Sequence, residues 1–410
     1  MSRLEEINFL DPALQKCPYA FNRQLREEAP VYLEPNTGYY LVSRYEDIKY
    51  VKRNPQLFSN QFNANSGQRL LPKVEEIAAR GWERPRTLHR TDPPVHTDHR
   101  KVIDRTFSLP RVKKMVPYIE GVVSSLMDQF PASGELDFVK DYCIPLPCII
   151  LADQLGVPRE DALMFRVWSD ALLDPVGLMI DEEREIECAH QTLEFQQYFA
   201  QRIEERRVHP RDDILTDLST RMEDETPLSI AQLLNMLEQI VTGGNESTAG
   251  LMGSALLLLI EKPDLVAQLR ADPALIPAFV EEALRLECPV QSNSRIVTQE
   301  TELGGITLPK GAQLILRYGS GNRDERQFSK PEEVDLARDG VEARSHVAFG
   351  FGAHNCPGKN LARQETISTF EELLRRYRGF ELTCNKDDLK YHPTFFLRGL
   401  QSLPVRLIPA

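Results

Sequence analysis

The chain has 410 residues, of which 41% are hydrophobic and 27% are charged, and its formal net charge is −12. The composition is that of an ordinary globular protein, and the excess of acidic residues argues against a general nucleic-acid binder, because phosphate binding needs clustered Lys and Arg. The N-terminus lacks a signal-peptide pattern, and the longest apolar stretch, 255–260, is too short to span a bilayer. We therefore expect a cytoplasmic protein without a membrane anchor.

The first predicted elements are two short strands. Segments 31–35 and 38–44 are rich in Val, Tyr and Leu and flank an Asn-Thr turn, which predicts a hairpin. Further strands are predicted within 294–317 and 380–407, whereas 97–287 has mostly helical periodicity. No internal repeat, low-complexity linker or Gly/Ser-rich hinge divides the chain. We expect one domain over 1–410, mainly α-helical with small peripheral β-sheets.

One predicted helix is unusually long. Ser229 and Gln232 form a capping box, helical periodicity continues over 230–261, and Pro263 ends it. At 1.5 Å per residue this helix is about 48 Å long and must cross the domain. Its middle, TGGNESTAG at 242–250, weakens a helix, because each glycine costs about 1 kcal/mol relative to alanine and Ser and Thr compete for backbone hydrogen bonds. Either another segment packs closely against the glycines, or a flat or reactive group approaches the helix here.

Seven cysteines are scattered along the chain without a C-x-x-C pair, which is typical of free thiols in a reducing compartment. Cys356 differs from the others because glycines precede it and a proline follows it. A nucleophilic cysteine needs a base, and His354 would point elsewhere in an extended loop. A zinc site needs three or four ligands, and the pair His96 and His99 lacks a recognisable third. A dinucleotide-binding loop would need glycine where Asn355 stands.

A thiolate ligand to a haem iron fits Cys356. Glycines permit a tight turn whose backbone N–H groups point at the sulfur, and the dipole of the helix that follows favours an anion. The stretch 349–358, FGFGAHNCPG, resembles the haem-thiolate loop F-G-x-G-x-H-x-C-x-G of the cytochrome P-450 family and matches it fully.

Other stretches resemble the family in the family's order, from the hairpin at 31 to the last strand. TDPPVHTDHRKVIDRTFS at 91–108 resembles D-P-P-x-H-x-x-x-R, and TGGNEST resembles the mid-helix signature A/G-G-x-D/E-T-T. Glu282 and Arg285 match E-x-x-R. GNRDERQF at 321–328 resembles A-N-R-D-P-x-x-F, with Gly321 and Glu325 as departures. The resemblance implies the cytochrome P-450 fold, with the long helix lying over a haem.

The resemblance implies haem b as cofactor and dioxygen as co-substrate, with Cys356 as the proximal iron ligand. A thiolate pushes electron density to the iron and favours O–O cleavage, which a serine does not do. Phe349 would pack near the sulfur, in the loop shaped by Gly350 and Gly358. The anionic haem propionates would be held by four side chains of matching family position. These are His96, Arg100, Arg295 and His354; for His96, a histidine satisfied at a helix start is the alternative.

On the distal side, the resemblance implies a kink at which Gly243 and Gly244 make room for dioxygen and substrate. Glu246 and Ser247 take the positions of the acid–alcohol pair that supplies protons for oxygen activation, and Thr248 follows. Serine in place of the family's usual threonine keeps the hydroxyl but loses the methyl that fixes the rotamer, so proton delivery would be looser. Glu282 and Arg285 would form a buried structural ion pair, joined by Arg338.

Electrons would come from separate proteins, because no flavin or iron–sulfur pattern accompanies the haem loop. The resemblance to soluble bacterial members implies a ferredoxin, a ferredoxin reductase and a monomeric enzyme. Basic residues expected on the proximal side could form a docking patch on an otherwise acidic protein, and a solvated charged face is the alternative. These residues are Arg105, Arg111, Lys113, Lys114, Lys359 and Arg363.

Family position places the substrate pocket in 61–92, around 172–180 and along the distal helix. It also places five further residues there, namely Val290, Gln291, Asn293, Phe395 and Phe396. This mixture predicts a mainly hydrophobic substrate with an oxygen function, such as a terpenoid, a steroid or an aromatic acid. The leading hypothesis is a monooxygenase that hydroxylates such a compound. The alternatives are a family member that performs desaturation or ring coupling, and a haem-binding carrier or sensor; a carrier would not need the proton relay at Glu246 and Ser247.

Overall fold

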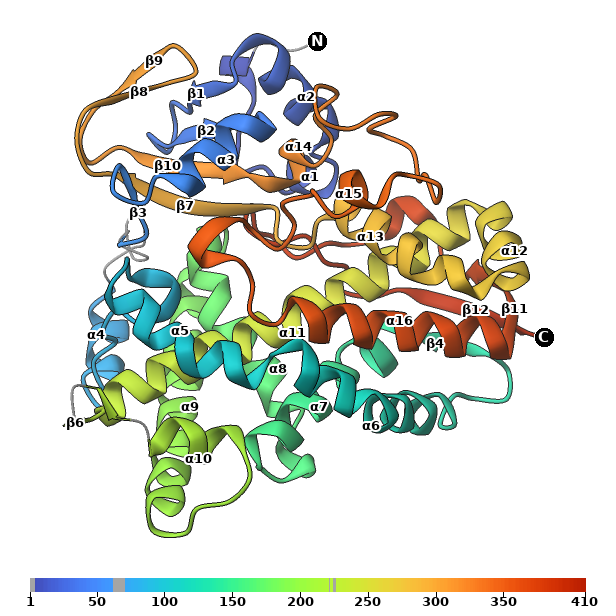
Figure 1. The fold of residues 1–410 in the computed structure, drawn as a ribbon, viewed down its shortest axis with the longest axis horizontal. Coiled ribbons are helices and arrows are strands. Elements are labelled where there is room, and N and C mark those ends of the chain that lie inside the picture. Colours follow the sequence, from blue (N-terminus) through green and yellow to red (C-terminus); the bar gives the residue numbers. More distant parts are fainter. Residues whose placement is uncertain (1–3, 62–70, 221, 224–225) are drawn as a thin grey trace.

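The computed structural model describes residues 4–61, 71–220, 222–223 and 226–410, and it is mainly α-helical with small sheets at the periphery, as predicted (Figure 1). The predicted pocket segment 61–92 therefore lies partly outside the described residues. The α-helices are α1 Pro12–Lys16, α2 Tyr19–Glu28, α3 Tyr45–Arg53, α4 Pro72–Ala78, α5 Val95–Thr106, α6 Leu109–Met127, α7 Pro145–Leu155, α8 Met164–Leu173, α9 Glu182–Val208, α10 Ile214–Ser219, α11 Ile230–Glu261, α12 Pro263–Ala271, α13 Ile276–Glu287, α14 Tyr318–Gly321, α15 Gly340–Ala343 and α16 Lys359–Arg376.

The main sheet has the strand order β1-β2-β10-β7-β3 and lies at one side of the helical region (Figure 1). The predicted hairpin forms its edge, with Val31 opposite Val42. Strand β10 pairs in parallel with β2 and antiparallel with β7, and its successive apolar residues are buried because both faces of this strand are covered. The strands are β1 Val31–Leu33, β2 Tyr40–Val42, β3 Phe58–Ser59, β4 Glu135–Asp137, β5 Met222–Glu223, β6 Thr226–Pro227, β7 Ser292–Val297, β8 Thr301–Leu303, β9 Ile306–Leu308, β10 Gln313–Arg317, β11 Tyr377–Leu382 and β12 Pro404–Pro409.

Helix α11 crosses the molecule, as its length predicted (Figure 1). It begins at the expected capping box of Ser229 and Gln232, and Pro263 begins the next helix. The helix is continuous through 242–250, so the expected kink is not a break in the element. Helices α7, α8, α13 and α16 pack around it, which explains why apolar residues occur on all sides of its second half.

The glycines of α11 divide between the two explanations offered by the sequence. A Cβ atom on Gly250 would lie 3.2 Å from the backbone oxygen of Arg398, so this glycine permits close packing. A Cβ atom on Gly243 would meet no atom within 4 Å, and Gly243 is exposed although it lies in the middle of the central helix. Gly243 therefore borders open space, whereas Gly250 serves contact between two segments.

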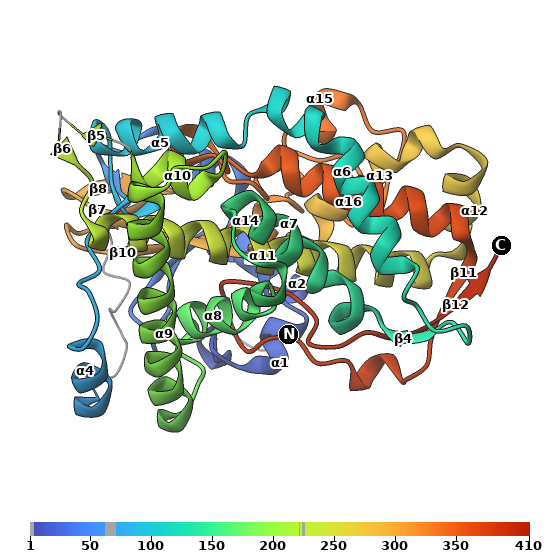
Figure 2. The same cartoon turned by 90° about the horizontal axis from the view of Figure 1, so that it is seen from below.

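Helix α16 follows directly after the Cys356 loop and packs against both α6 and α11 (Figure 2). The loop is thereby fixed to the centre of the molecule at its C-terminal end. Among the described residues, no helix combines the length and the apolar character that crossing a membrane requires.

Candidate active site

The loop around Cys356 is held mainly by its own backbone. Gly350 and Gly352 have φ angles of +69° and +72°, which L side chains rarely adopt. The Cys356 N–H donates to the Phe349 carbonyl at 2.9 Å, and the Asn355 side chain donates to the carbonyls of Phe349 and Gly350. Gly352 also allows close approach to α3, because a Cβ atom there would lie 2.9 Å from the Lys52 carbonyl. Gly350 and Gly352 are therefore required by the backbone angles of the loop and, for Gly352, by its close approach to α3.

The surroundings of the Cys356 sulfur act on its charge in opposite directions. Burial raises the pKa of the Cys356 thiol, whereas the Gly358 N–H and the positive charges of Arg100, Lys359 and Arg363 oppose that rise. The guanidinium of Arg363 also lies over the Phe349 ring, 4.6 Å from its centroid. These donors and cations suit a thiolate that binds a metal cation.

Cationic and polar side chains gather beside this loop. Arg295 is buried and donates to the Asn293 side chain and the Ser294 carbonyl, but no carboxylate pairs with it among the described residues. Lys52 is 6% exposed and likewise has no acidic partner in the described part of the chain. Burial, reinforced by the charge of Arg295, holds the pKa of Lys52 well below its usual value.

Two histidines from distant segments meet at the same place. The rings of His96 and His354 lie 3.8 Å apart between centroids, and neither His354 ring nitrogen has a hydrogen-bond partner in the described structure. Burial lowers the pKa of His96 to about 4 and depresses that of His354 further. Arg100 plays a different part, since it donates to the Asn355 carbonyl at 2.7 Å and pairs with Asp104.

The cationic and polar side chains beside the Cys356 loop suit an anionic prosthetic group. A Cβ atom on Gly350 would lie 3.8 Å from the Lys52 Nζ and 3.7 Å from the Tyr318 hydroxyl, which is buried without a partner. Buried cations without counter-ions are costly, and two carboxylates of a haem would supply the missing charge. Lys52 and Tyr318 were not among the predicted residues, because a lysine in a polar helix and a tyrosine after a strand are typical of ordinary surface and core positions.

The open side of α11 carries the predicted acid and alcohol. The Ser247 hydroxyl donates to the Gly243 carbonyl at 3.0 Å, one turn earlier, and Thr248 is buried. The Glu246 side chain is 8% exposed, and its Oε1 lies 3.1 Å from the Arg166 Nε. Burial raises the pKa of Glu246 well above its usual range, and the charge of Arg166 opposes this effect. The Glu246 carboxyl therefore retains a proton more readily than an exposed one.

Arg166 joins Glu246 to two further groups that the sequence did not single out. Its Nε lies 2.9 Å from an Asp170 oxygen, and its Nη2 lies 3.1 Å from the His392 Nε2. Asp170 follows Arg166 by one turn of α8, which is a common ion-pair spacing, so the sequence alone would suggest a solvated pair. The packing of α8 on α11 brings that pair to Glu246.

The E-x-x-R pair lies buried below the haem loop. Arg285 and Glu282 form two contacts of 2.8 and 2.9 Å, and the Arg338 Nε donates to Glu282 at 3.0 Å. The Arg285 side chain also donates to the Asn322 carbonyl, and the Asn322 side chain accepts from the Val347 N–H. The pair thereby supports the chain two residues before Phe349.

Two of the five predicted pocket residues require correction. Gln291 is buried and donates to the carbonyls of Glu287 and Cys288, so its side chain folds back on α13. Phe395 is buried against Phe9, with ring centroids 5.1 Å apart, in a cluster below the main sheet. The neighbouring Phe396 is half-buried and packs against the same cluster. Val290 is also half-buried, and Asn293 is half-buried and bound to Arg295.

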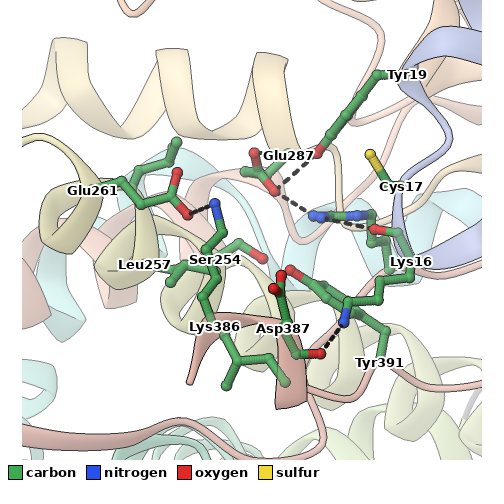
Figure 3. Close-up of a pocket in the computed structure, with 13 residues that line it drawn as sticks. Lys16, Cys17, Tyr19, Ser254, Leu257, Glu261, Glu287, Lys386, Asp387 and Tyr391 are labelled. Atoms are coloured by element: carbon green, nitrogen blue, oxygen red, sulfur yellow. Dashed lines mark hydrogen bonds and ion pairs between the residues drawn. The ribbon is translucent and has the colours of Figure 1, made fainter. Parts of the chain in front are cut away.

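A cavity of about 250 Å³ lies at the C-terminal end of α11 (Figure 3), and none of its lining residues belongs to the Cys356 loop. Its charged groups largely neutralise one another, since Glu287 takes contacts from Tyr19 and Arg398, and Glu261 pairs with Lys386. It contains none of the predicted catalytic residues. Across the described residues, no three His, Cys, Asp or Glu side chains form a metal-binding group, which leaves the His96 and His99 zinc hypothesis without support.

Comparison with known proteins agrees with this geometry. Residues 171–402 match the model of the cytochrome P-450 family. Cytochrome P-450 107B1 of Saccharopolyspora erythraea is 32% identical over 90% of this chain and 89% of its own. Linalool 8-monooxygenase of Pseudomonas putida is 33% identical over 96% of this chain and 97% of its own. The solved structure of cytochrome P-450 CREJ in complex with (4-ethylphenyl) dihydrogen phosphate has a TM-score of 0.91 at 26% identity and covers 99% of this chain and 100% of its own. The chain therefore belongs to the cytochrome P-450 family of monooxygenases, which bind haem b and use dioxygen.

Proposed function

We propose that this enzyme hydroxylates a small, mainly hydrophobic substrate and receives electrons from a ferredoxin and its reductase. The observation that carries the proposal is the position of Glu246 and Ser247 on the side of α11 that opens at Gly243. A protein that only carries haem needs no acid and alcohol beside the open space. The haem, when bound, supplies oxygen activation and the oxidation of the substrate.

In this proposal, Cys356 holds the iron, and the backbone of its loop keeps the sulfur in place. Arg295, Lys52 and His354 receive the haem carboxylates, with His96 stacked on His354 and Tyr318 as a further donor. Phe349, Gly350 and Gly358 shape the loop, and Arg100 secures it through the Asn355 carbonyl. Gly243 leaves room on the opposite side, and Gly244 lies against Leu151.

Protons reach the site through Ser247 and Glu246. Glu246 is buried and holds its proton firmly, so it can donate to the neighbouring hydroxyl and regain the proton from outside. Arg166 fixes the position of the Glu246 carboxyl. Ser247 must leave its bond to the Gly243 carbonyl in order to donate into the open space, and its unbranched side chain makes this rotation easier than for threonine.

The electron donor would dock beside α5, α6 and the start of α16. Arg105, Lys113 and Lys114 are exposed there. Two predicted members of the patch contribute less free charge, since Arg363 pairs with Glu281 and the Arg111 Nη1 lies 4.0 Å from Asp217. Lys359 bonds to the Asn355 side chain and so belongs to the haem loop. The docking patch is thus smaller than the sequence suggested.

The substrate class rests on the half-buried Val290, Asn293 and Phe396, which combine apolar and polar character. Relatives of the chain include an enzyme named for linalool and one solved with an aryl phosphate, so the fold accepts small molecules of both kinds. We propose a terpenoid, steroid or aromatic compound that carries an oxygen function.

The test begins with the purified haem protein, reduced and treated with carbon monoxide. We expect a strongly red-shifted main haem band, the mark of thiolate ligation. A panel of candidate substrates is then screened for a change from low to high spin, and hits are turned over with a surrogate ferredoxin and reductase under isotopically labelled dioxygen. Incorporation of one labelled oxygen atom into product supports the proposal, and reductant consumption that gives only desaturated or coupled product contradicts it.

A further inference from the structure

Three arginines gather in segment 84–90, beside the first half of α11. Arg84 forms an ion pair with Glu238 at 2.8 Å, and Arg86 is exposed and donates to the Gln61 side chain. Arg90 is different, because its Nε is shielded from solvent and has no hydrogen-bond or ion-pair partner in the described structure. Burial lowers the pKa of Arg90, and the charges of Arg84 and Arg86 lower it further.

The local charge is strongly unbalanced. Glu238 is the carboxylate that acts on Arg90; its Oε2 is engaged by Arg84 and by the Asn235 amide, whereas its Oε1 is shielded without a hydrogen-bond partner among the described residues. One carboxylate thus faces three guanidinium groups. Arg90 is half-buried, and its shielded Nε has no partner among the described residues, so an incoming anion that accepts from this nitrogen would satisfy it.

Arg90 lies next to the open side of α11. It ends the short 3-10 helix η2 Leu88–Arg90, which is tied to α11 by the His89 N–H donating to Gln239 and by the Thr87 hydroxyl contacting Asn235. Gln239 precedes Gly243 by one helical turn and therefore shares its face. The 87–90 segment consequently flanks the open space at Gly243.

Arg90 is also distinct from the group that fits the haem carboxylates. Lys52 approaches the Cys356 loop at Gly350 and Arg295 lies on β7, whereas Arg90 ends a segment that is tied to α11 through Asn235 and Gln239. The chain therefore offers two separate positive sites, one beside the Cys356 loop and one at Arg90.

We infer that Arg90 binds an acidic group, a carboxylate or a phosphate, on an otherwise apolar substrate and so holds the apolar part against the Gly243 face of α11. This inference rests on the proposed function and specifies its substrate class. The planar guanidinium matches either oxyanion with paired hydrogen bonds, and a shielded setting strengthens such a contact.

The test uses the purified haem protein and three compounds of similar size: para-propylbenzoate, para-propylphenyl phosphate and the neutral para-propylbenzyl alcohol. Each is titrated while the spin shift of the haem is followed. We expect at least one acid to bind roughly ten- to a hundredfold more tightly than the alcohol. Tighter binding of the benzoate identifies a carboxylate as the natural group, and tighter binding of the aryl phosphate identifies a phosphate.

Three variants distinguish a direct contact between Arg90 and the acid from a general attraction by the positive charges of the arginine cluster. Arg90→Gln should abolish the preference for the acid and leave binding of the alcohol unchanged. Arg90→Lys should keep part of the preference, and Arg86→Gln, which removes an exposed charge of the same cluster, should weaken acid binding less than threefold.

The inference is overturned if the wild-type protein binds the alcohol as tightly as both acids, if neither acid binds, or if Arg90→Gln and Arg86→Gln weaken acid binding equally. The carbon monoxide spectrum of each sample shows that its haem site is intact. A wild-type protein without the red-shifted band would contradict the proposed function itself, which distinguishes that failure from a loss of acid selectivity alone.

Discussion

The Cys356 side and the α11 side of the site are held by different kinds of interaction. The Cys356 loop is shaped by neighbouring backbone groups, with positive φ angles at Gly350 and Gly352 and the Cys356 N–H bonded to Phe349. The side formed by α11 depends on side chains from distant segments, such as Arg166 on α8, which meets Glu246. The side that holds Cys356 is therefore determined by residues close together in the sequence. The side that carries the acid, the alcohol and the substrate space depends on how the helices pack.

The largest expected effect comes from the thiol itself. Cys356→Ser should abolish the red-shifted band of the reduced carbon monoxide complex, because a neutral hydroxyl cannot replace the thiolate. The loop backbone should remain, since the Cys356 N–H bond to Phe349 does not involve the sulfur and the serine oxygen can accept from the Gly358 N–H in its place. Cys17→Ser, which changes an exposed thiol, is the control and should keep the full spectrum. Retention of the band in Cys356→Ser would refute the ligand assignment.

The support below the loop should be the next most sensitive. Glu282→Gln leaves Arg285 and Arg338 buried without their shared carboxylate, so we expect the free energy of unfolding to fall by about 3–5 kcal/mol. Denaturant unfolding of the haem protein measures this. Glu135→Gln, which breaks an exposed pair with Arg406, should cost less than about 1 kcal/mol. Equal losses in both variants would show that the buried pair gives no special support.

A buried carboxyl on α16, the helix that follows the Cys356 loop, should make stability depend on pH. Glu365 on α16 is 2% exposed, its Oε2 has no partner in the described structure, and burial raises its pKa to about 8. The folded state therefore binds this proton more tightly than the unfolded state. The resulting stability is complete below the usual glutamate pKa, falls as pH rises, and is lost by about pH 8.

Glu365→Gln removes this titration, so the variant should gain up to a few kcal/mol relative to wild type between pH 5 and pH 8. The free energy of unfolding, measured for both proteins across that range, checks the expectation. Parallel pH curves for the two proteins would mean that Glu365 is not the group responsible.

The smallest expected effect concerns proton delivery. Ser247→Ala should leave the haem spectrum intact and divert reducing equivalents to peroxide, lowering the fraction that reaches product several-fold, because the proposed proton route from Glu246 loses its hydroxyl. Product and peroxide are measured together during turnover. Ser254→Ala, a buried hydroxyl two turns further along α11, is the matched control. Unchanged coupling in Ser247→Ala would remove Ser247 from the proton route.

Several features were predictable because they depend on residues close in sequence. The hairpin at 31–44, the capping box of Ser229 and Gln232, and the length of α11 follow from local propensities and were found where expected. The Glu282–Arg285 pair follows from helical spacing, although its burial does not. Gln291 and Phe395 were misplaced because the side of an extended segment that faces the core is set by the elements packed against it.

By itself, the sequence determined the Cys356 loop and the extent of α11, because glycine conformations, caps and neighbouring hydrogen bonds act over a few residues. Only the tertiary structure decided that Lys52, Arg295 and Arg90 form no ion pair among the described residues, and which glycine of α11 borders open space. Burial and charge pairing join segments that are far apart in the chain, so the same lysine or arginine is solvated in one fold and shielded in another.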